Sequence, residues 1–337
     1  MNWLALDIGG ANLKVADGRG YGAVQPFALW REPGRLIEAL RNAITKGPAC
    51  DRIAATMTGE LADCFDSKED GVRFILRALE TAADGGYISV YQTDGRLEQL
   101  ESAYCNPCLA AAANWHALAR FAGRYAESGT ALLIDIGSTT TDVIPLVDGR
   151  PQTAGHTDTE RLLSGELVYT GVERSPVCSV LGYLPYRQQL CPVAQELFAT
   201  TWDVYLTLSE LPEEPDNRNT ADGRPATRAA SRARLARMIC ADVTMFETVD
   251  ALAAAEAIRA RQTAKIGVAV AQVAARLGRA PESVILSGAG EFLARRVVER
   301  MNLRGRLISL GDELGPALSR CAPAHALAVL AREGIET

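Results

Sequence analysis

The stretch LALDIGGANLKVAD, residues 4–17, has a second version further along the chain, LLIDIGSTTTDVIPL at residues 132–146. Each version runs from an apolar strand through Asp, Ile and Gly into a small polar turn and then a second strand, which is the pattern of a hairpin. One copy alone is typical of an ordinary hairpin turn. Two copies in halves of similar design predict a duplicated domain with a cleft between the halves.

The residue types in these two turns suit a phosphate group. Glycine lets the backbone approach a ligand closely, and a tight turn points several N–H groups at one anion. An aspartate at the end of the preceding strand can hold Mg²⁺, which prefers hard oxygen ligands and keeps much of its water. The first turn supplies Asp7, Gly9, Gly10, Asn12 and Lys14, and the second supplies Asp135, Gly137, Ser138, Thr139, Thr140 and Asp142. We therefore expect Asp7 and Asp135 to be metal ligands and, with Lys14 and Asp142, to be catalytic.

A third motif follows at VILSGAGEFL, residues 284–293, where a buried strand leads through a Gly-x-Gly turn into a helix. The N-terminus of such a helix favours anions, because its free N–H groups and its dipole point at them. Gly288 and Gly290 are therefore candidate phosphate or nucleotide contacts.

The bulk composition is ordinary for a soluble globular protein. The chain has 337 residues and a net charge of −6, a length that favours two domains and a charge that argues against nucleic-acid binding. No apolar run reaches the ~18 residues of a membrane span, and the N-terminus has no signal-peptide pattern. We expect a cytoplasmic protein, and a homodimer is left open. The expected domains are residues 1–128 and 129–337.

The spacing of apolar residues predicts alternating strands and helices. The expected strands are 2–8, 11–16, 52–57, 87–92, 97–100, 131–136, 141–147, 283–286 and 306–309. The expected helices are 33–45, 68–83, 110–125, 192–208, 227–242, 249–277, 292–301 and 322–332. Residues 210–226 form an exposed loop that leads into the arginine-rich stretch between Arg224 and Arg237. This stretch is either a solvated face or part of a lid that closes over an anionic substrate.

Of the eight cysteines, only Cys105 and Cys108 have the spacing of a metal or redox pair. A zinc site needs about four ligands, and no second pair is present in the sequence. A structural role is therefore favoured over a surface redox pair or a metal site completed by distant residues.

The two hairpins and the Gly-x-Gly motif, in that order, resemble the two phosphate motifs and the adenosine motif of the acetate kinase, sugar kinase, Hsp70 and actin superfamily. The fold that this resemblance implies is an α/β fold of two ribonuclease-H-like subdomains around a central phosphate-binding cleft, with the last helix returning toward the first subdomain. Within the superfamily, the second hairpin and GHTDTERLLSGELVYTGVERSPV at residues 155–177 resemble the hydantoinase/oxoprolinase branch.

Within that branch, the chain is most similar to a small single-chain group linked to tetrahydromethanopterin-dependent one-carbon metabolism. DGRPAT at 222–227 and RLARMICAD at 234–242 also resemble that group. The chain is far shorter than true hydantoinase or oxoprolinase subunits, which argues against ATP-driven ring opening.

The resemblance implies a transferase of methanofuran or methylofuran biosynthesis. Such an enzyme condenses an aminomethyl-furanylmethyl diphosphate with a tyramine- or tyrosine-type phenol, such as γ-glutamyltyramine, to form an ether and release pyrophosphate. The cofactor would be Mg²⁺. The alternatives are an ATP-dependent small-molecule kinase or hydantoinase-like amidohydrolase, and a nucleotide-gated module without enzymatic activity.

Residues 155–177 offer further candidates for the site. His156, Asp158 and Glu160 are candidate bases or second metal ligands. Arg161 and Arg174 can each pair with a carboxylate or phosphate in a bidentate manner, and Tyr169 can stack on an aromatic acceptor. The alternative is a surface connection whose charges are simply solvated.

Overall fold

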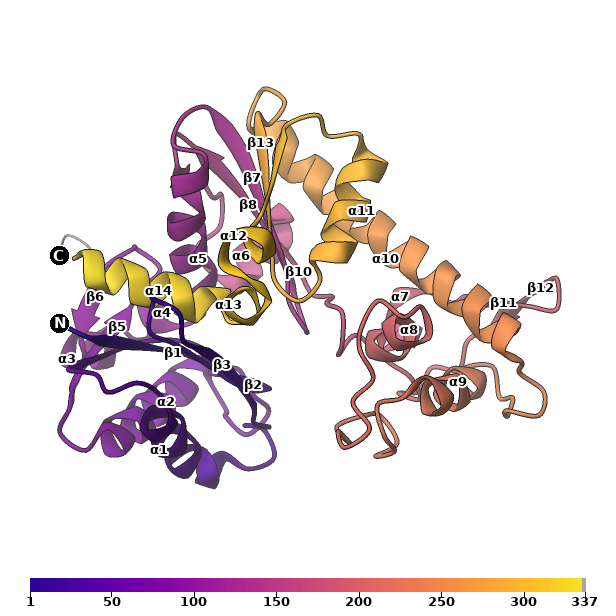
Figure 1. Ribbon diagram of the computed structural model, residues 1–337, viewed down its shortest axis with the longest axis horizontal. Helices are drawn as coiled ribbons and strands as arrows, with labels where there is room; N and C mark the ends of the chain where they lie inside the picture. Colours follow the sequence, from indigo (N-terminus) through magenta and orange to yellow (C-terminus); the bar gives the residue numbers. More distant parts are fainter. Residues whose placement is uncertain (335–337) are drawn as a thin grey trace.

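The computed structural model describes residues 1–334, in which two mixed sheets are flanked by helices (Figure 1). In the first sheet, the central strand β1 pairs antiparallel with β2 and parallel with β4. The sheet order is β3-β2-β1-β4-β5-β6. Its strands are β1 (Trp3–Gly9), β2 (Asn12–Ala16), β3 (Gly22–Pro26), β4 (Arg52–Thr58), β5 (Tyr87–Tyr91) and β6 (Leu97–Gln99).

The second sheet repeats this arrangement. Its central strand β7 pairs antiparallel with β8 and parallel with β13, in the order β10-β8-β7-β13-β14, and β9 pairs with β8. Its strands are β7 (Thr130–Ile136), β8 (Thr141–Val147), β9 (Arg150–Pro151), β10 (Leu167–Val168), β13 (Ser283–Ser287) and β14 (Arg306–Ser309). The structure therefore has the predicted α/β class with two ribonuclease-H-like sheets.

The register of the strands reveals a repeat that the sequence pattern alone did not. Asp7 lies opposite Lys14 on β2 and beside Thr56 on β4. Asp135 lies opposite Asp142 on β8 and beside Ser287 on β13. The segment TMTGE at residues 56–60 thus corresponds to SGAGE at residues 287–291, so that the Gly-x-Gly motif has a counterpart in the first half.

Helices cover both faces of the first sheet. Residues of α1 and α2 form an apolar core with one face, whereas α14 packs on the other face beside α5. Residues 322–331 of α14 are all buried. The helical segments of this part are η1 (Pro33–Arg35), α1 (Leu36–Lys46), α2 (Lys68–Ala83), α3 (Leu100–Cys105), α4 (Pro107–Ala110), α5 (Asn114–Ala122), η2 (Gly123–Tyr125) and α14 (Ala322–Glu333).

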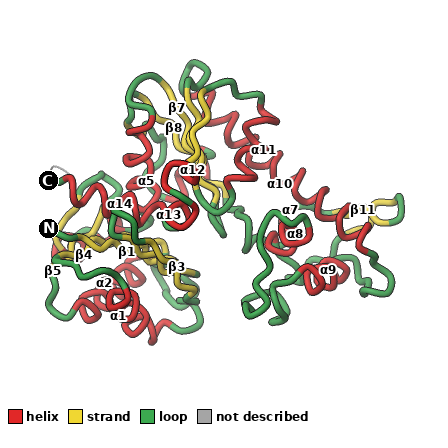
Figure 2. The backbone as a smooth tube through the Cα atoms, in the orientation of Figure 1, coloured by secondary structure: helices red, strands yellow, loops and turns green. Residues whose placement is uncertain are grey.

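Much of the rest of the chain packs along one long helix, α10. Several short elements gather near the end of α10 that lies away from the second sheet and form a separate lobe there (Figure 2). The lobe consists of α7 (Val177–Val180), β11 (Tyr183–Tyr186), β12 (Gln189–Pro192), α8 (Thr201–Thr207) and α9 (Arg228–Arg237). The other helices are α6 (Asp158–Ser164), α10 (Thr248–Arg276), α11 (Glu291–Met301), α12 (Leu310–Leu314) and α13 (Pro316–Arg320).

Three of the predicted helices are wrong in extent. The helix expected at 227–242 ends at Arg237 in α9, and Cys240 beyond it has a φ of 57°. The helix expected at 192–208 is confined to α8, because Pro192 ends strand β12 and the helix begins only at the capping box of Thr200 and Asp203. The helix expected at 110–125 is interrupted, because Ala112 has a φ of 49° and α5 starts at Asn114. Among residues 1–334, no helix is both long and apolar enough to cross a membrane.

Candidate functional site

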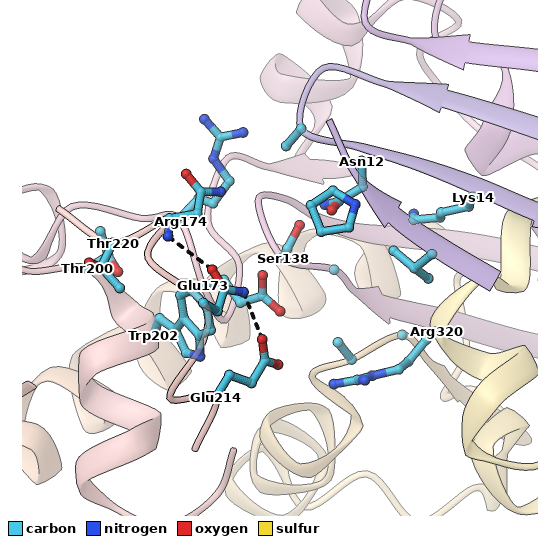
Figure 3. A pocket seen from close by; sticks show the side chains of 18 of the residues that line it. Asn12, Lys14, Ser138, Glu173, Arg174, Thr200, Trp202, Glu214, Thr220 and Arg320 are labelled. Carbon is cyan, nitrogen blue, oxygen red and sulfur yellow. Dashed lines mark hydrogen bonds between the residues drawn. The ribbon is translucent and has the colours of Figure 1, made fainter. Parts of the chain in front are cut away.

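A cavity of about 630 Å³ lies between the two sheets, at the ends of the paired hairpins. Its walls come from both hairpin turns, the Gly-x-Gly turn, residues 173–176, the loop 210–226 and the end of α13. Figure 3 shows Lys14 and Arg320 on one side of this cavity and Trp202, Glu173 and Glu214 on the other. The cleft predicted from the duplicated hairpins therefore exists as a defined space.

Many of the predicted phosphate contacts line the cavity. These are Asn12 and Lys14 from the first hairpin, Asp135, Gly137 and Ser138 from the second, Gly288 from the third motif, and Arg174. Others belong to the same turns without forming the cavity wall, namely Asp7, Gly9, Gly10, Thr139, Thr140 and Gly290.

Carboxylates from both halves of the chain act on the charge of one lysine, Lys14. The Lys14 Nζ lies 3.2 Å from Asp7 Oδ2, and Asp7 is only 2% exposed. Burial acts to lower the pKa of Lys14, but the nearby charges of Asp7 and Asp135 outweigh it and raise the pKa. Lys14 therefore stays an ammonium ion at neutral pH and places a fixed positive charge at this end of the cavity.

The surroundings of Asp135, in contrast to those of Lys14, favour its neutral form. Burial and the charge of Asp142, which faces it across the strand pair, raise the pKa of Asp135 to about 7. Its Oδ1 is buried and has no hydrogen-bond partner among the described residues, and the same is true of Asp7 Oδ1. Burying a polar atom without a partner costs free energy, so these two carboxylate oxygens indicate that a ligand completes the site.

The first glycine of the third motif is required by close packing. Gly288 has a φ of +89°, and a Cβ there would lie 2.4 Å from the carbonyl oxygen of Ile136 and 2.7 Å from Asp135 Oδ1. Gly171 is similar, because a Cβ would lie 2.5 Å from the carbonyl oxygen of Gly137. Both glycines let neighbouring segments press on the second hairpin and so fix the position of Asp135.

The structure does not bring most of the 155–177 candidates to the cavity. His156, Asp158, Glu160, Arg161 and Tyr169 do not line it, and neither does Asp142 of the second hairpin. Glu160 instead completes the capping box that begins α6, accepting hydrogen bonds from the backbone N–H groups of His156 and Thr157. The T-x-x-E spacing of Thr157 and Glu160 is the sequence signal that could have revealed this helix.

Arg161 is a structural residue in this arrangement. It is 1% exposed, its Nη2 lies 2.5 Å from Asp142 Oδ1, and its guanidinium stacks 4.1 Å from the ring centroid of Trp115. It also lies 3.6 Å from Asp158, which in turn is 3.9 Å from Lys68. This chain of charges supports Asp142 beneath the hairpin, and it leaves Arg161 unavailable to a substrate in the cavity.

Sequence analysis missed several residues of the cavity wall. Trp30, Glu173, Trp202, Glu214 and Arg320 all line it. The Arg174 guanidinium lies 4.3 Å from the centroid of the Trp30 ring, so that this contact spans the cleft between the first and second halves. The backbone N–H groups of Glu173 and Arg174 both donate to the carbonyl oxygen of Ser138. No local pattern marks a tryptophan in a loop as part of such a wall.

The loop 210–226 contributes to the cavity through Glu214, Asn217, Asn219, Thr220 and Ala221. It is anchored rather than loose. Asp222 pairs with Arg234 at 2.9 Å and with Arg237 at 3.0 Å, and the fully buried Arg234 also lies 2.6 Å from Asp203. Within the predicted arginine cluster, Arg234 therefore holds the loop in place, and lid motion stays a prediction.

The Cys105 and Cys108 pair is not part of a metal-ligand cluster among the described residues. Cys105 and Cys108 are exposed and free. Across residues 1–334, no group of three or more His, Cys, Asp or Glu side chains is arranged to hold a metal ion.

Glu60 is a further buried acid that sequence analysis missed. It is 1% exposed, and its Oε2 has no partner among the described residues. Burial and, to a smaller extent, the nearby charge of Asp158 raise the pKa of Glu60 to about 7, although a backbone N–H group and the charge of Lys68 oppose the shift. Its counterpart in the repeat, Glu291, accepts hydrogen bonds from Ser309 Oγ, the Gly311 N–H and Ser319 Oγ. The first half thus lacks the donors that satisfy this acid in the second.

Glu60→Gln is expected to remove a pH-dependent loss of stability. Because the folded state raises the pKa of Glu60 from about 4.5 to about 7, the carboxyl destabilises the fold increasingly as pH rises through that window. At 1.36 kcal/mol per pKa unit, the variant gains about 3 kcal/mol over the wild type at pH 8 and nothing at pH 4. Urea unfolding of both proteins from pH 4 to pH 8 measures the difference.

Glu291→Gln is the matched control for this experiment. It occupies the equivalent position in the second half, but its carboxylate has three donors, and an amide cannot accept all of them. This variant should be less stable than the wild type at pH 8. A stability difference between Glu60→Gln and the wild type that does not change with pH would refute the expectation.

Comparisons with known proteins give a family and two named relatives. A family model described as hydantoinase/oxoprolinase matches residues 51–333. A (4-{4-[2-(gamma-L-glutamylamino)ethyl]phenoxymethyl}furan-2-yl)methanamine synthase of Methanocaldococcus jannaschii is 31% identical over 336 residues, 99% of this chain and 98% of the relative. A synthase of the same name from Methanococcus vannielii is 28% identical over 201 residues, 59% of this chain and 89% of the relative.

Similar solved structures are more distant. An inorganic polyphosphate/ATP-glucomannokinase from Arthrobacter sp. strain KM is 14% identical with a TM-score of 0.47, and the match covers 99% of both chains. The activator of 2-hydroxyisocaproyl-CoA dehydratase from Clostridium difficile is 11% identical with a TM-score of 0.42, covering 100% of this chain and 99% of the other.

Proposed function

The chain belongs to the hydantoinase/oxoprolinase family, and from this premise we propose that it is a transferase of methanofuran- or methylofuran-type cofactor biosynthesis. It condenses an aminomethyl-furanylmethyl diphosphate with a tyramine- or tyrosine-type phenol to form an ether and pyrophosphate. Support comes from the relative in Methanocaldococcus jannaschii, whose name describes a phenoxymethyl-furan product and which aligns over 99% of this chain. The observation that carries the proposal is a cavity with a cationic end and an aromatic end.

The cationic end suits the diphosphate. Lys14 and Arg320 line it, together with the Asn12 amide and the Ser138 hydroxyl. Fixed donors and charges of this kind act most strongly where negative charge develops in the transition state. In this reaction that charge develops on the bridging oxygen as the carbon–oxygen bond to the diphosphate breaks.

The bond changes balance without a further reactant. The electron pair of the breaking carbon–oxygen bond goes to pyrophosphate, and the phenol oxygen forms the new bond to the furanylmethyl carbon. The phenol proton goes to an oxygen of the departing pyrophosphate. The furan oxygen can stabilise positive charge on the reacting carbon, so Lys14 and its neighbours assist mainly by holding the leaving group.

The site also fits Mg²⁺. The ion commonly binds through one or two carboxylates, its own waters and substrate phosphates, and the unpartnered Oδ1 atoms of Asp7 and Asp135 are two such carboxylate oxygens. When bound, Mg²⁺ would neutralise charge on the diphosphate. Asp7 and Asp135 would hold the ion, directly or through water.

Product analysis tests the proposal. The protein is incubated with an aminomethyl-furanylmethyl diphosphate and tyramine or γ-glutamyltyramine, and separately with ATP and the same phenols. We expect pyrophosphate release with an ether product by mass spectrometry and no ATP turnover. ATP hydrolysis coupled to phosphorylation or ring opening would instead support the kinase or amidohydrolase alternative.

Asp7→Ala and Asp135→Ala are each expected to abolish turnover while leaving the protein folded. The measurement is pyrophosphate release, with circular dichroism as the check on folding. The exposed Glu196→Ala, which lies near the cavity without lining it, is the control. Full turnover in both aspartate variants would remove their proposed metal role.

A further inference from the structure

The end of the cavity opposite Lys14 combines carboxylates with aromatic surface. Glu173, Glu214 and Trp202 line the cavity on this side (Figure 3). Trp30 lines the same cavity and contacts Arg174 there. Two carboxylates would repel a diphosphate group bound beside them, because all of these groups carry negative charge. The chemistry of this end must therefore suit a different part of a bound molecule.

Glu173 is held in place by its backbone, which leaves its side chain free. Its N–H donates to the carbonyl oxygen of Ser138 in the second hairpin, and its carbonyl oxygen accepts from the N–H of Trp202 at the start of α8. The residue thus fastens the phosphate turn to the lobe. Its half-buried carboxylate faces the cavity with no direct hydrogen-bond partner among the side chains of residues 1–334.

Glu214 approaches from the loop 210–226. Asn217 Nδ2 donates to Glu214 Oε2 at 2.8 Å, and the Glu214 N–H bonds the carbonyl oxygen of Ala226. Burial raises the pKa of Glu173, and the charge of Glu214 raises it further, while Arg320, Lys14 and Arg174 oppose the shift without cancelling it. Both carboxylates line the same cavity, and a bound cation would balance their negative charge.

The aromatic residues restrict what that cation can be. Trp30 and Trp202 both line this space, and the Arg174 guanidinium already stacks on the Trp30 ring. Aromatic side chains of this kind suit a flat ring as well as a cation. The unpartnered Oδ1 of Asp135, in the wall nearer the phosphate turns, independently indicates that the cavity is completed by a ligand. A molecule that meets all of these features carries a diphosphate, an aromatic ring and a positive charge.

We propose that Glu173 and Glu214 form a binding subsite for a primary ammonium group attached to an aromatic ring. This rests on the proposed function, in which the ammonium is the aminomethyl group of the furanylmethyl diphosphate. With the diphosphate at Lys14 and the ammonium at Glu173 and Glu214, the furan is held at both ends. The reacting carbon then lies between them, where the phenol can reach it.

The test compares two furanylmethyl diphosphates that differ in one substituent, which is charged in the first and neutral in the second. One carries the aminomethyl group, and in the other a neutral hydroxymethyl group replaces it. For the wild type, we expect kcat/KM to be at least about 100-fold higher for the amine, since a site built for a polar group strongly rejects an analogue that leaves it unpaired. Glu173→Gln and Glu214→Gln should each reduce kcat/KM for the amine at least tenfold and leave the hydroxymethyl compound within about threefold.

Two measurements separate this inference from the proposed function. Pyrophosphate binding by calorimetry should be unchanged or tighter in Glu173→Gln and Glu214→Gln, because both lose negative charge. The control Glu196→Gln, an exposed acid beside the cavity-lining Leu197, should behave as the wild type with both diphosphates.

The outcomes are distinct. Equal turnover of the two diphosphates by the wild type would overturn the ammonium subsite and leave the proposed function standing. The subsite is likewise overturned if both glutamine variants keep the preference for the amine. If neither diphosphate is turned over and pyrophosphate does not bind, the proposed function fails and the subsite fails with it.

Discussion

Lys14→Gln is expected to lower kcat about 100-fold or more with aminomethyl-furanylmethyl diphosphate, while pyrophosphate binding also weakens. The Lys14 ammonium lies between Asp7 and Asp135 at the cationic end of the cavity. Removing one preorganised group that stabilises transition-state charge typically costs about 10²–10³ in kcat. Glutamine keeps a donor for the buried Asp7 carboxylate, so the variant should fold.

Lys68→Gln is the matched control. Lys68 also lies at the junction of the two halves, where it pairs with Asp158 at 3.9 Å, but it does not line the cavity. Its replacement should change kcat less than threefold. If Lys14→Gln keeps more than a tenth of the wild-type kcat, the leaving group is not held by this lysine, and the assignment of the cationic end is wrong.

Arg234→Ala should be the most destabilising single change in the lobe. The guanidinium is fully buried and pairs with Asp203 and Asp222. Removing one partner of a buried ion pair leaves uncompensated charge and typically costs about 3–5 kcal/mol. Since Asp222 lies in the loop 210–226, the loop also loses its main anchor. Urea unfolding gives the free energy, and limited proteolysis reports cleavage in the loop.

Arg237→Ala provides the comparison on the same helix. Arg237 also pairs with Asp222, but it is 38% exposed, and exposed ion pairs contribute about 0–1 kcal/mol. A loss of stability below about 1 kcal/mol is expected, with little added cleavage. Equal stability of the Arg234 and Arg237 variants would mean that Arg234 does not anchor the loop.

The fold was predictable because its deciding features are local. Each hairpin carries its strands, its turn glycines and its aspartate within 15 residues or fewer, and β13 is recognisable as an apolar run before Gly288. The incorrect part of the helix expected at 192–208 arose because apolar residues of a loop, such as Val193 and Phe198, mimic helical spacing while they pack into a core formed by other segments. Periodicity does not reveal which partner covers an apolar residue.

Apart from Arg174, the site was predictable where the hairpins and the Gly-x-Gly turn form the wall. Asn12, Lys14, Asp135 and Ser138 follow from the hairpins, whereas Trp30 and Glu214 reach the cavity from loops that only the tertiary fold brings there. The charged residues of 155–165 misled for another reason. Arg161 and Glu160 have the side chains of a binding site, but they use them to support α6 and Asp142.

The stacking of Arg174 on Trp30 joins residues from opposite walls of the cleft. Any motion that moves these two walls apart must separate the guanidinium from the indole and let water reach that ring. The fluorescence emission of Trp30 is therefore expected to shift to longer wavelength when the walls of the cleft move apart. In a protein in which Trp3, Trp115 and Trp202 are replaced by phenylalanine, Trp30 fluorescence would report the rates at which substrate enters and product leaves.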